Sequence, residues 1–296
     1  RPSTDILGTI LPEVAQELGL SEHTQVACGG VDNACMALGA GCVAAGMAYT
    51  SLGSSAWIAV SGHQPIVDIQ YKPYVFTHCI PGMFVSSTAI FSAGSAFRWL
   101  RDTVCQNLLD EPAPYDAMTR LAAQAPIGAN KLIFNPSLAG GSSLDKSPNI
   151  KGGFIGLQLG HTQGDLIRAA MEGICLNLKI ALDVMGSYMS LSDDMLLVGG
   201  GGKSRFWRSL FANIYHKNIL ETNIGQDAGS LGAAAVAAVG VGLWKDFTIV
   251  PRLHVLKSRL EPDQMTFEKY DSLLSLFKRI ALVQADIGDW IEQISW

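Results

Sequence analysis

The stretch LLVGGGGKS, residues 196–204, joins an apolar strand pattern to the start of a helix. The apolar triplet predicts a buried strand, the four glycines predict a turn, and Ser204 opens an amphipathic helix. Four consecutive glycines cost conformational entropy on folding, so a purely structural turn would rarely need all of them. Bare backbone at the start of a helix suits a phosphate or a flat ring. We therefore expect a ligand site here, although the GxGxxG spacing of dinucleotide folds is absent.

Strand and helix patterns alternate from about residue 130 onward, which predicts an α/β fold. The Gly-, Ser-, Pro- and Asn-rich residues 136–153 predict a long loop. Strands are expected at 25–28, 47–50, 56–60, within 66–85, and at 131–135, 195–198 and 218–222. Helices are expected at 10–20, 33–45, 92–107, 115–124, 162–187, from 204 onward, at 229–243 and at 271–296.

A second glycine site is GGVDN, residues 29–33. It places the carboxylate of Asp32 at a strand-to-helix junction, where α/β proteins bind their ligands. Asp is also among the best helix N-cap residues, and the spacing alone favours that structural role. A ligand-binding carboxylate and a plain cap therefore both stay open at this point.

A third site is TSLGSS, residues 50–55, between two predicted strands. Consecutive small residues leave backbone N–H groups open, and the hydroxyl groups add donors, a combination that suits phosphate oxygens. The spacing is not that of the GxxxxGK[ST] loop. Taken alone, the segment is more typical of a simple hairpin turn.

The sequence also contains two similar segments, here called the echo segments. Asp32 heads the small-residue segment that contains Gly39, and Asp227 heads a similar segment that contains Gly232. This similarity is consistent with a duplicated α/β unit, and equally with a chance match between two Ala- and Gly-rich helices.

Composition excludes several classes of protein. Of 296 residues, 48% are apolar, which is enough for a sizeable core, and the net charge of −5 argues against nucleic-acid binding. Residues 33–67 carry no Asp, Glu, Lys or Arg, but glycines and Pro65 interrupt them, so no membrane span is expected. The chain starts at Arg1 without a signal peptide, which favours the cytoplasm.

Histidines and cysteines give no sign of a metal site or of a hydrolase. The six histidines are scattered, and neither an HExxH nor a GxSxG pattern occurs. Cys28, Cys35 and Cys42 recur every seven residues, which would be consistent with a metal or redox cluster. Small core residues are the favoured interpretation.

Taken in order, these sites resemble the FGGY family of carbohydrate kinases, and its xylulose kinases most closely. GGVDNA (29–34) resembles the GGxDNA stretch of that family, and residues 50–55 resemble its second phosphate loop. Further similar segments are residues 91–102 (xxAGxxxxWLRD), 161–173 (HxxxxLxRAxxEG), 199–207 (GGGAKSxxW) and 226–229. The resemblance extends from about residue 10 to about residue 290.

The resemblance implies an actin-like, ribonuclease-H-like ATPase fold with two domains and ATP in the cleft between them. Residues 1–45 would be the end of domain I, residues 46–250 the ATP-binding domain II, and residues 251–296 a C-terminal loop and helix. Nothing matches the N-terminal half of domain I. We therefore expect this chain to be a C-terminal portion, inactive alone, with that missing half as its partner.

The resemblance also implies transfer of the γ-phosphoryl group of MgATP to a hydroxyl of xylulose or a related ketose or polyol. Asp32 would accept the proton of that hydroxyl. No protein ligand for a metal is assigned. The residues implied to contact ATP are Gly53, Ser54, Gly94, Arg98, Gly200, Gly201 and Arg205.

One departure from the family keeps an alternative open. Residues 136–145, PSLAGGSSLD, stand where many members have GERxP. The alternatives are a different sugar, a non-catalytic relative that binds nucleotide or sugar, or a purely structural α/β domain. Association as a homodimer is also left open.

Overall fold

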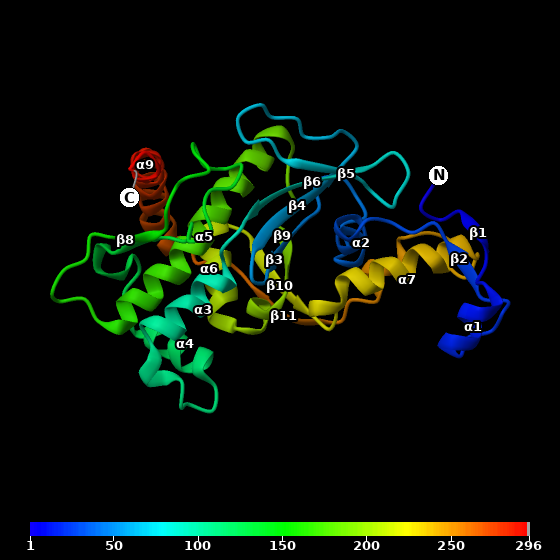
Figure 1. Ribbon diagram of the computed structural model, residues 1–296, viewed down its shortest axis with the longest axis horizontal. Coiled ribbons are helices and arrows are strands. Elements are labelled where there is room, and N and C mark those ends of the chain that lie inside the picture. Colours follow the sequence, from blue (N-terminus) through cyan, green and yellow to red (C-terminus); the bar gives the residue numbers. More distant parts are fainter. Residues whose placement is uncertain (295–296) are drawn as a thin grey trace.

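The computed structural model describes residues 1–294 and is built around one mixed seven-stranded sheet (Figure 1). Its strands are β3 (Ala48–Leu52), β4 (Ala56–Gly62), β5 (Tyr74–Thr77), β6 (Phe84–Ile90), β9 (Asp194–Val198), β10 (Asn218–Thr222) and β11 (Leu256–Leu260). They are ordered β11-β10-β9-β3-β4-β6-β5. β9 runs parallel to both neighbours, and all other pairs are antiparallel. The predicted α/β class is confirmed.

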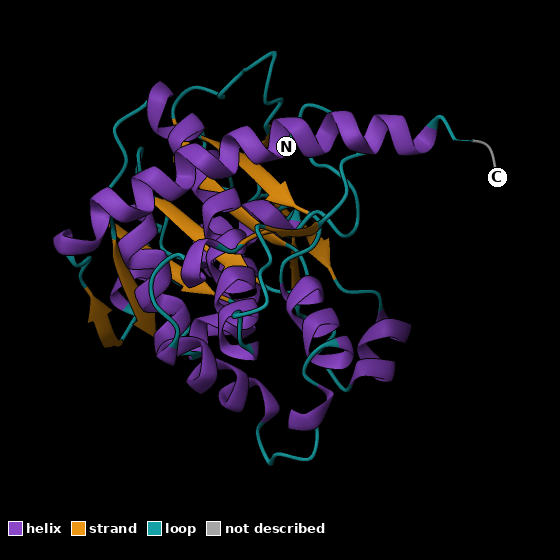
Figure 2. Ribbon diagram, turned by 90° about the vertical axis from the view of Figure 1, so that its left-hand side faces the viewer, coloured by secondary structure: helices purple, strands orange, loops and turns teal. Residues whose placement is uncertain are grey.

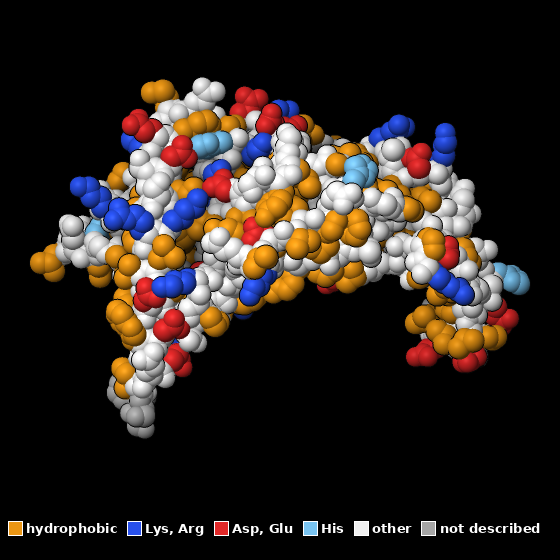
Figure 3. All heavy atoms as spheres, turned by 90° about the horizontal axis from the view of Figure 1, so that it is seen from above, with side chains coloured by type: hydrophobic (Ala, Val, Ile, Leu, Met, Phe, Trp, Pro, Cys, Tyr) orange, Lys and Arg blue, Asp and Glu red, His pale blue; other side chains and the backbone are white. Residues whose placement is uncertain are grey.

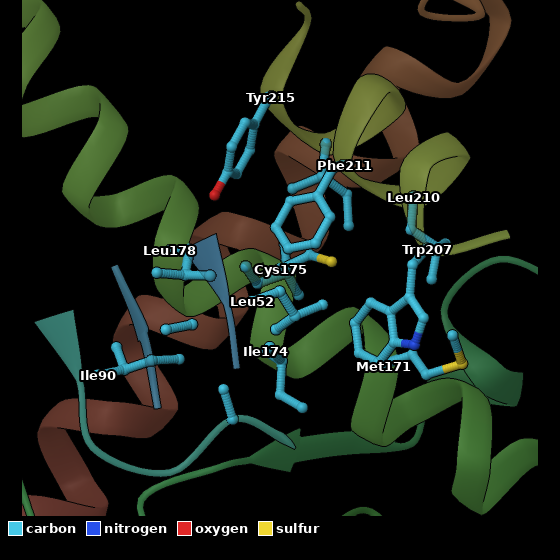
Figure 4. Close-up of a cluster of buried hydrophobic side chains, with 14 of the residues drawn as sticks. Leu52, Ile90, Met171, Ile174, Cys175, Leu178, Trp207, Leu210, Phe211 and Tyr215 are labelled. Atoms are coloured by element: carbon cyan, nitrogen blue, oxygen red, sulfur yellow. The ribbon is translucent and has the colours of Figure 1, made fainter. Parts of the chain in front are cut away.

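The larger core lies between one face of this sheet and five helices. These are α3 (Gly94–Thr103), α4 (Pro114–Gln124), α5 (Gln163–Tyr188), α6 (Arg205–Tyr215) and α9 (Phe267–Glu292). Figure 4 shows Leu52 and Ile90 facing side chains of α5 and α6, among them Cys175 and Phe211. Two predicted helix starts are confirmed, since Thr162 and Asp165 form a capping box and Ser204 caps α6.

Two short helices, α2 (Asp32–Gly39) and α7 (Ala228–Gly240), lie side by side against the other face. Their backbones touch, because a Cβ on Gly39 would lie 1.7 Å from the Ala228 oxygen, and one on Gly232 would lie 1.8 Å from the Cys35 oxygen. The two echo segments are therefore packing partners. Small residues are required where helix backbones approach this closely.

The first thirty residues form a separate small unit. β1 (Ile6–Thr9) pairs antiparallel with β2 (Gln25–Ala27), and α1 (Pro12–Leu18) connects them. This unit lies at the opposite end of the molecule from α9 (Figure 1). In Figure 3, seen from above, both ends project as arms on one side of the body. The N-terminal unit exposes Leu7, Leu11, Leu18, Leu20 and Val26.

Several boundaries differ from the expectations. The helix expected at 92–107 ends at Thr103, followed by a 3-10 turn at Gln106–Leu108. α9 begins four residues before Asp271 and ends at Glu292, and its predicted extension over residues 295–296 lies outside the described residues. Figure 2 shows the end of α9 extending past the rest of the molecule.

Two short strands flank the loop at residues 136–152. It connects β7 (Ile133–Asn135) to β8 (Gly153–Ile155), which form their own two-stranded sheet, so a long loop here is confirmed. A short helix, α8 (Ile249–Arg252), follows α7. Within residues 1–294, no helix combines the length and apolar character that a membrane crossing requires.

Candidate functional site

Two of the glycine loops meet at one edge of the sheet. β3 and β9 are parallel neighbours, with Ser51 paired to Val198, so the loops that follow them leave the sheet together. A Cβ on Gly199 would lie 2.6 Å from the Leu52 oxygen, and one on Gly201 would lie 2.2 Å from Leu52 Cδ2. Nothing lies within 4 Å of a Cβ on Gly200.

Packing against β3 and β9 therefore accounts for much of the glycine run. Gly199, Gly201 and Gly202 each stand where a side chain would collide with Leu52 or Leu197. The expectation that a structural turn would not need all four glycines is therefore wrong for these three, because packing requires each of them. Gly200 alone among them faces open space that a ligand can use.

Six of the seven residues implied to contact ATP line one cavity of about 740 Å³. They are Gly53, Ser54, Gly94, Arg98, Gly200 and Gly201. Arg205, the seventh, is exposed at the start of α6 and does not line it. The cavity thus collects residues from the loop after β3, the first turns of α3 and the loop after β9.

The turn at residues 53–55 presents unpaired backbone donors. The Gly94 amide donates to the Gly53 oxygen at 2.9 Å, and the Ala93 and Ser95 amides donate to the Ser54 oxygen. Within residues 1–294, the Ser54 and Ser55 amides themselves have no backbone acceptor. Two successive free amides in a turn are suited to binding an anion. Gly94, by contrast, serves to bring α3 against this turn.

Further residues of the cavity were not predicted from the sequence. Tyr115, Asp116 and Thr119 of α4 line it, as do Lys203 and Gln226. Tyr115 is held in place, because its ring stacks on Phe97 at 5.8 Å and its hydroxyl accepts from Arg101 at 3.0 Å. The signal in the sequence was weak, since Pro114 predicts only that a helix begins there.

Asp32 is exposed at the first position of α2, and it is not the helix cap. The N-cap residue is Val31, which has no side-chain cap, so the capping alternative is wrong. Asp32 Oδ1 accepts from the Asn33 amide at 2.7 Å and from Asn33 Nδ2 at 3.1 Å. Oδ2 has no donor among the residues that the structure describes, so it remains available to a ligand.

Asp32 lines a second cavity of about 380 Å³. Four aromatic residues line it: Trp57 at the start of β4, Tyr74 and Phe76 of β5, and Phe91 after β6. Tyr74 and Phe76 are two residues apart on a strand and so face the same side. The Trp57 indole is fixed by donating to Tyr49 Oη at 3.0 Å. None of these four residues was predicted as a site residue from the sequence.

The two cavities are neighbours, divided by a single turn. Ser54 lines the larger cavity and Ser55 lines the cavity that contains Asp32. Within residues 1–294, no three His, Cys, Asp or Glu side chains lie close enough together to hold a metal ion.

Comparison with known proteins gives the same family as these motifs. Residues 48–241 match the C-terminal domain of the FGGY family of carbohydrate kinases. The chain belongs to this family. The resemblance seen in the sequence is thereby confirmed, and the FGGY assignment rests on most of the chain.

Individual relatives agree with this FGGY assignment. Xylulose kinase from Staphylococcus epidermidis (strain ATCC 12228) is 32% identical over 279 residues, which are 94% of this chain and 55% of that protein. Gluconokinase from Bacillus subtilis is 25% identical over 93% of this chain and 55% of that protein. The chain spans about half the length of the curated relatives it matches.

The fold agrees as well. The crystal structure of xylulose kinase from Rhodospirillum rubrum superimposes with a TM-score of 0.86 at 26% identity, over 98% of this chain and 57% of that one. FGGY kinases have the actin-like ATPase fold, so the predicted fold is confirmed.

Proposed function

We propose that the protein transfers the γ-phosphoryl group of ATP to a hydroxyl of a sugar, xylulose or a related ketose or polyol. One observation carries this proposal. Six residues assigned to ATP from the sequence line a single cavity, and the carboxylate assigned as base lines its neighbour across one turn. Phosphoryl transfer depends mainly on such positioning.

The residues of the larger cavity fit a nucleoside triphosphate. Its volume lies within the usual range of ligand pockets, about 300–1,000 Å³. The Ser54 and Ser55 amides would hold phosphate oxygens, and Arg98 and Lys203 would neutralise their charge. Bound MgATP supplies the phosphoryl group. The backbone around Gly200 leaves room for the nucleoside.

Asp32 would act as the general base. Its Oδ2 is free to accept the proton of the sugar hydroxyl, while the two bonds from Asn33 hold Oδ1 in place. A positioned carboxylate of this kind contributes about 10²–10⁴-fold to the rate. The aromatic faces of Trp57, Tyr74 and Phe76 would pack against the apolar face of the sugar.

The choice of a ketose is supported by relatives that are xylulose kinases. Because the chain spans about half of their length, we propose that the rest of domain I completes the cleft. The exposed Leu7, Leu18 and Val26 of the N-terminal unit support such a partner. The 296 residues alone would then be inactive. We place the activity in the cytoplasm, where ATP is available.

The test is sugar-dependent ADP release by full-length protein carrying Asp32→Asn or Asp32→Ala. We expect turnover to fall by about 10²–10⁴-fold while nucleotide affinity changes little. Asp110→Asn, an exposed carboxylate away from both cavities, is the matched control. Near-normal turnover in both Asp32 variants would overturn the assignment of the base.

A non-catalytic nucleotide-binding relative is the second candidate, because residues 136–145 lack the GERxP sequence of many FGGY members. In this chain the segment closes on itself, since Asp145 Oδ2 accepts from the Ser142 amide at 2.8 Å. Nucleotide binding without sugar-stimulated ADP release would favour this candidate. No nucleotide binding at all would favour a structural domain. Homodimer formation stays a prediction, to be checked by light scattering.

A further inference from the structure

Two buried thiols meet above Gly30, at the entrance to α2. A Cβ on Gly30 would lie 2.6 Å from Cys79 Sγ and 3.2 Å from Cys35 Sγ. The two sulfur atoms therefore border the space that a side chain at residue 30 would fill. Cys35 lies in the first turns of α2, and Cys79 follows β5, so chain folding brings them together.

The two thiols are unequal. The interaction with the Cys79 thiol lowers the pKa of Cys35 to about 7, against the opposing effects of burial and of the Asp32 carboxylate, and the Cys35 sulfur lies 3.5 Å from the Gly30 oxygen. The interaction with Cys35 and burial raise the pKa of Cys79 well above its ordinary value, although the Ser3 hydroxyl opposes them. The other neighbours of the pair, on α2 and α7, are apolar, among them Ala34 and Val236.

The two thiols lie just beneath the protein surface, where a small oxidant can reach them. Cys35 and Cys79 are 5% and 2% exposed, but Gly30 is itself exposed and has no side chain to cover them. Burial raises the pKa of Cys42 to about 12 and that of Cys105 to about 11, which leaves them protonated and unreactive at neutral pH.

We propose that Cys35 and Cys79 form a reversible disulfide when the protein is exposed to a peroxide. The Cys35 thiolate attacks one oxygen of hydrogen peroxide, the O–O bond breaks, and with one proton the products are Cys35 sulfenic acid and water. The Cys79 sulfur then displaces the hydroxyl of the sulfenic acid as a second water, forming the S–S bond. A dithiol reductant restores both thiols.

This pair differs from the cluster that the sequence spacing suggested. Cys28 and Cys42 share the seven-residue interval with Cys35, but Cys28 is exposed and Cys42 lies in another cluster of the core. The partner of Cys35 is 44 positions away in the sequence. A disulfide would link α2 to the segment after β5. Because Cys35 is three residues after Asp32, the bond would restrain the helix that carries the proposed base.

The primary test is a mass measurement on wild-type full-length protein, which does not depend on any kinase activity. Reduced protein is treated with a few equivalents of hydrogen peroxide, alkylated and digested. We expect a peptide pair joined through Cys35 and Cys79 that disappears after dithiothreitol. Oxidation confined to the exposed Cys28, or the absence of this linked pair, would overturn the proposal.

Variants of the two cysteines distinguish the thiol that is oxidised first, Cys35, from the thiol that attacks the sulfenic acid, Cys79. In Cys79→Ser we expect dimedone to trap Cys35 sulfenic acid, and in Cys35→Ser we expect no oxidation at Cys79. Cys105→Ser should form the linked pair as wild type does. The rate of iodoacetamide labelling at Cys35 should reach half its maximum near pH 7, and at higher pH in Cys79→Ser. Equal labelling profiles in the two proteins would contradict the proposed pairing.

Discussion

Gly39 of α2 and Ala228 of α7 touch through their backbones, at the point where the two echo segments of the sequence cross. A methyl group on Gly39 would lie 1.7 Å from the Ala228 oxygen, closer than any real contact allows. Since the obstacle is backbone, neither helix can yield by rotating a side chain. The position of α2, and with it the position of Asp32, therefore depends on this glycine.

Gly39→Ala should destabilise the protein by about 1–3 kcal/mol, because the helices must separate to admit the methyl group. The measurement is urea unfolding followed by circular dichroism. Gly186→Ala in α5 is the matched control, since its Cβ would meet only Leu191 at an ordinary 3.7 Å. The control should be neutral or gain up to about 1 kcal/mol from helix propensity. Equal effects of the two substitutions would contradict the steric argument.

Glu172→Gln should cost about 3–5 kcal/mol of stability. The Glu172 carboxylate is buried and accepts from Arg168 Nε at 2.8 Å, from the Gly128 amide at 3.1 Å and from Tyr270 Oη at 3.2 Å. A neutral amide would leave the buried Arg168 charge without its counter-ion. Asp183→Asn removes the same kind of i,i+4 pair at a partly exposed site, and should cost at most about 1 kcal/mol.

His78 should make the protein sensitive to acid. Burial lowers the pKa of His78 to about 4, and its ring accepts from the Ile80 amide at 3.0 Å while Nε2 contacts the Cys42 oxygen at 3.1 Å. The unfolded chain binds a proton near pH 6.5 and the folded one only near pH 4. Stability is therefore complete above pH 6.5 and falls by about 3 kcal/mol as the pH decreases to 4.

Unfolding free energies measured from pH 7 to pH 4.5 check this behaviour. His78→Gln should flatten the dependence on pH across this range, because the glutamine side chain does not titrate. His63→Gln, at an exposed position, should keep the wild-type slope. A wild-type slope in the His78 variant would show that other groups cause the acid sensitivity.

Arg98 and Arg205 were both implied to contact ATP, and the structure distinguishes them. Arg98 lines the larger cavity and Arg205 does not. Arg98→Gln should therefore weaken nucleotide binding about tenfold or more, since a charge-assisted bond to phosphate is worth about 1.5–3 kcal/mol. Arg205→Gln should leave it unchanged. Titration of a fluorescent ATP analogue measures both, and a larger effect at Arg205 would reverse the two assignments.

The sequence predicted the elements with strong periodic patterns and missed strands whose patterns are weak. Helix α5 and strand β9 were anticipated because a capping box and an apolar run mark them. Most of β6 was missed, since its centre is Ser86-Ser87-Thr88. These polar side chains are buried because their strand lies inside the sheet, between β4 and β5, a tertiary setting that local propensity does not encode.

The site was predicted unevenly for a related reason. The glycines and Asp32 stand in short contiguous motifs along the chain, so their types and order could be recognised. Tyr115, Trp57 and Tyr74 lie on three separate elements and meet the cavities only after the sheet and α4 are assembled. Cys35 and Cys79 are another such case, since no local spacing relates them.

The turn of Ser54 and Ser55 has one further consequence. Ser54 lines the larger cavity and Ser55 lines the cavity of Asp32, so the covalent geometry of adjacent residues, rather than side-chain rotamers, sets the spacing of the two cavities. The two cavities are lined by different secondary-structure elements. Substitutions in β4 and β5 should therefore reshape the cavity of Asp32 while the larger cavity keeps its shape, so the two cavities can change independently during evolution.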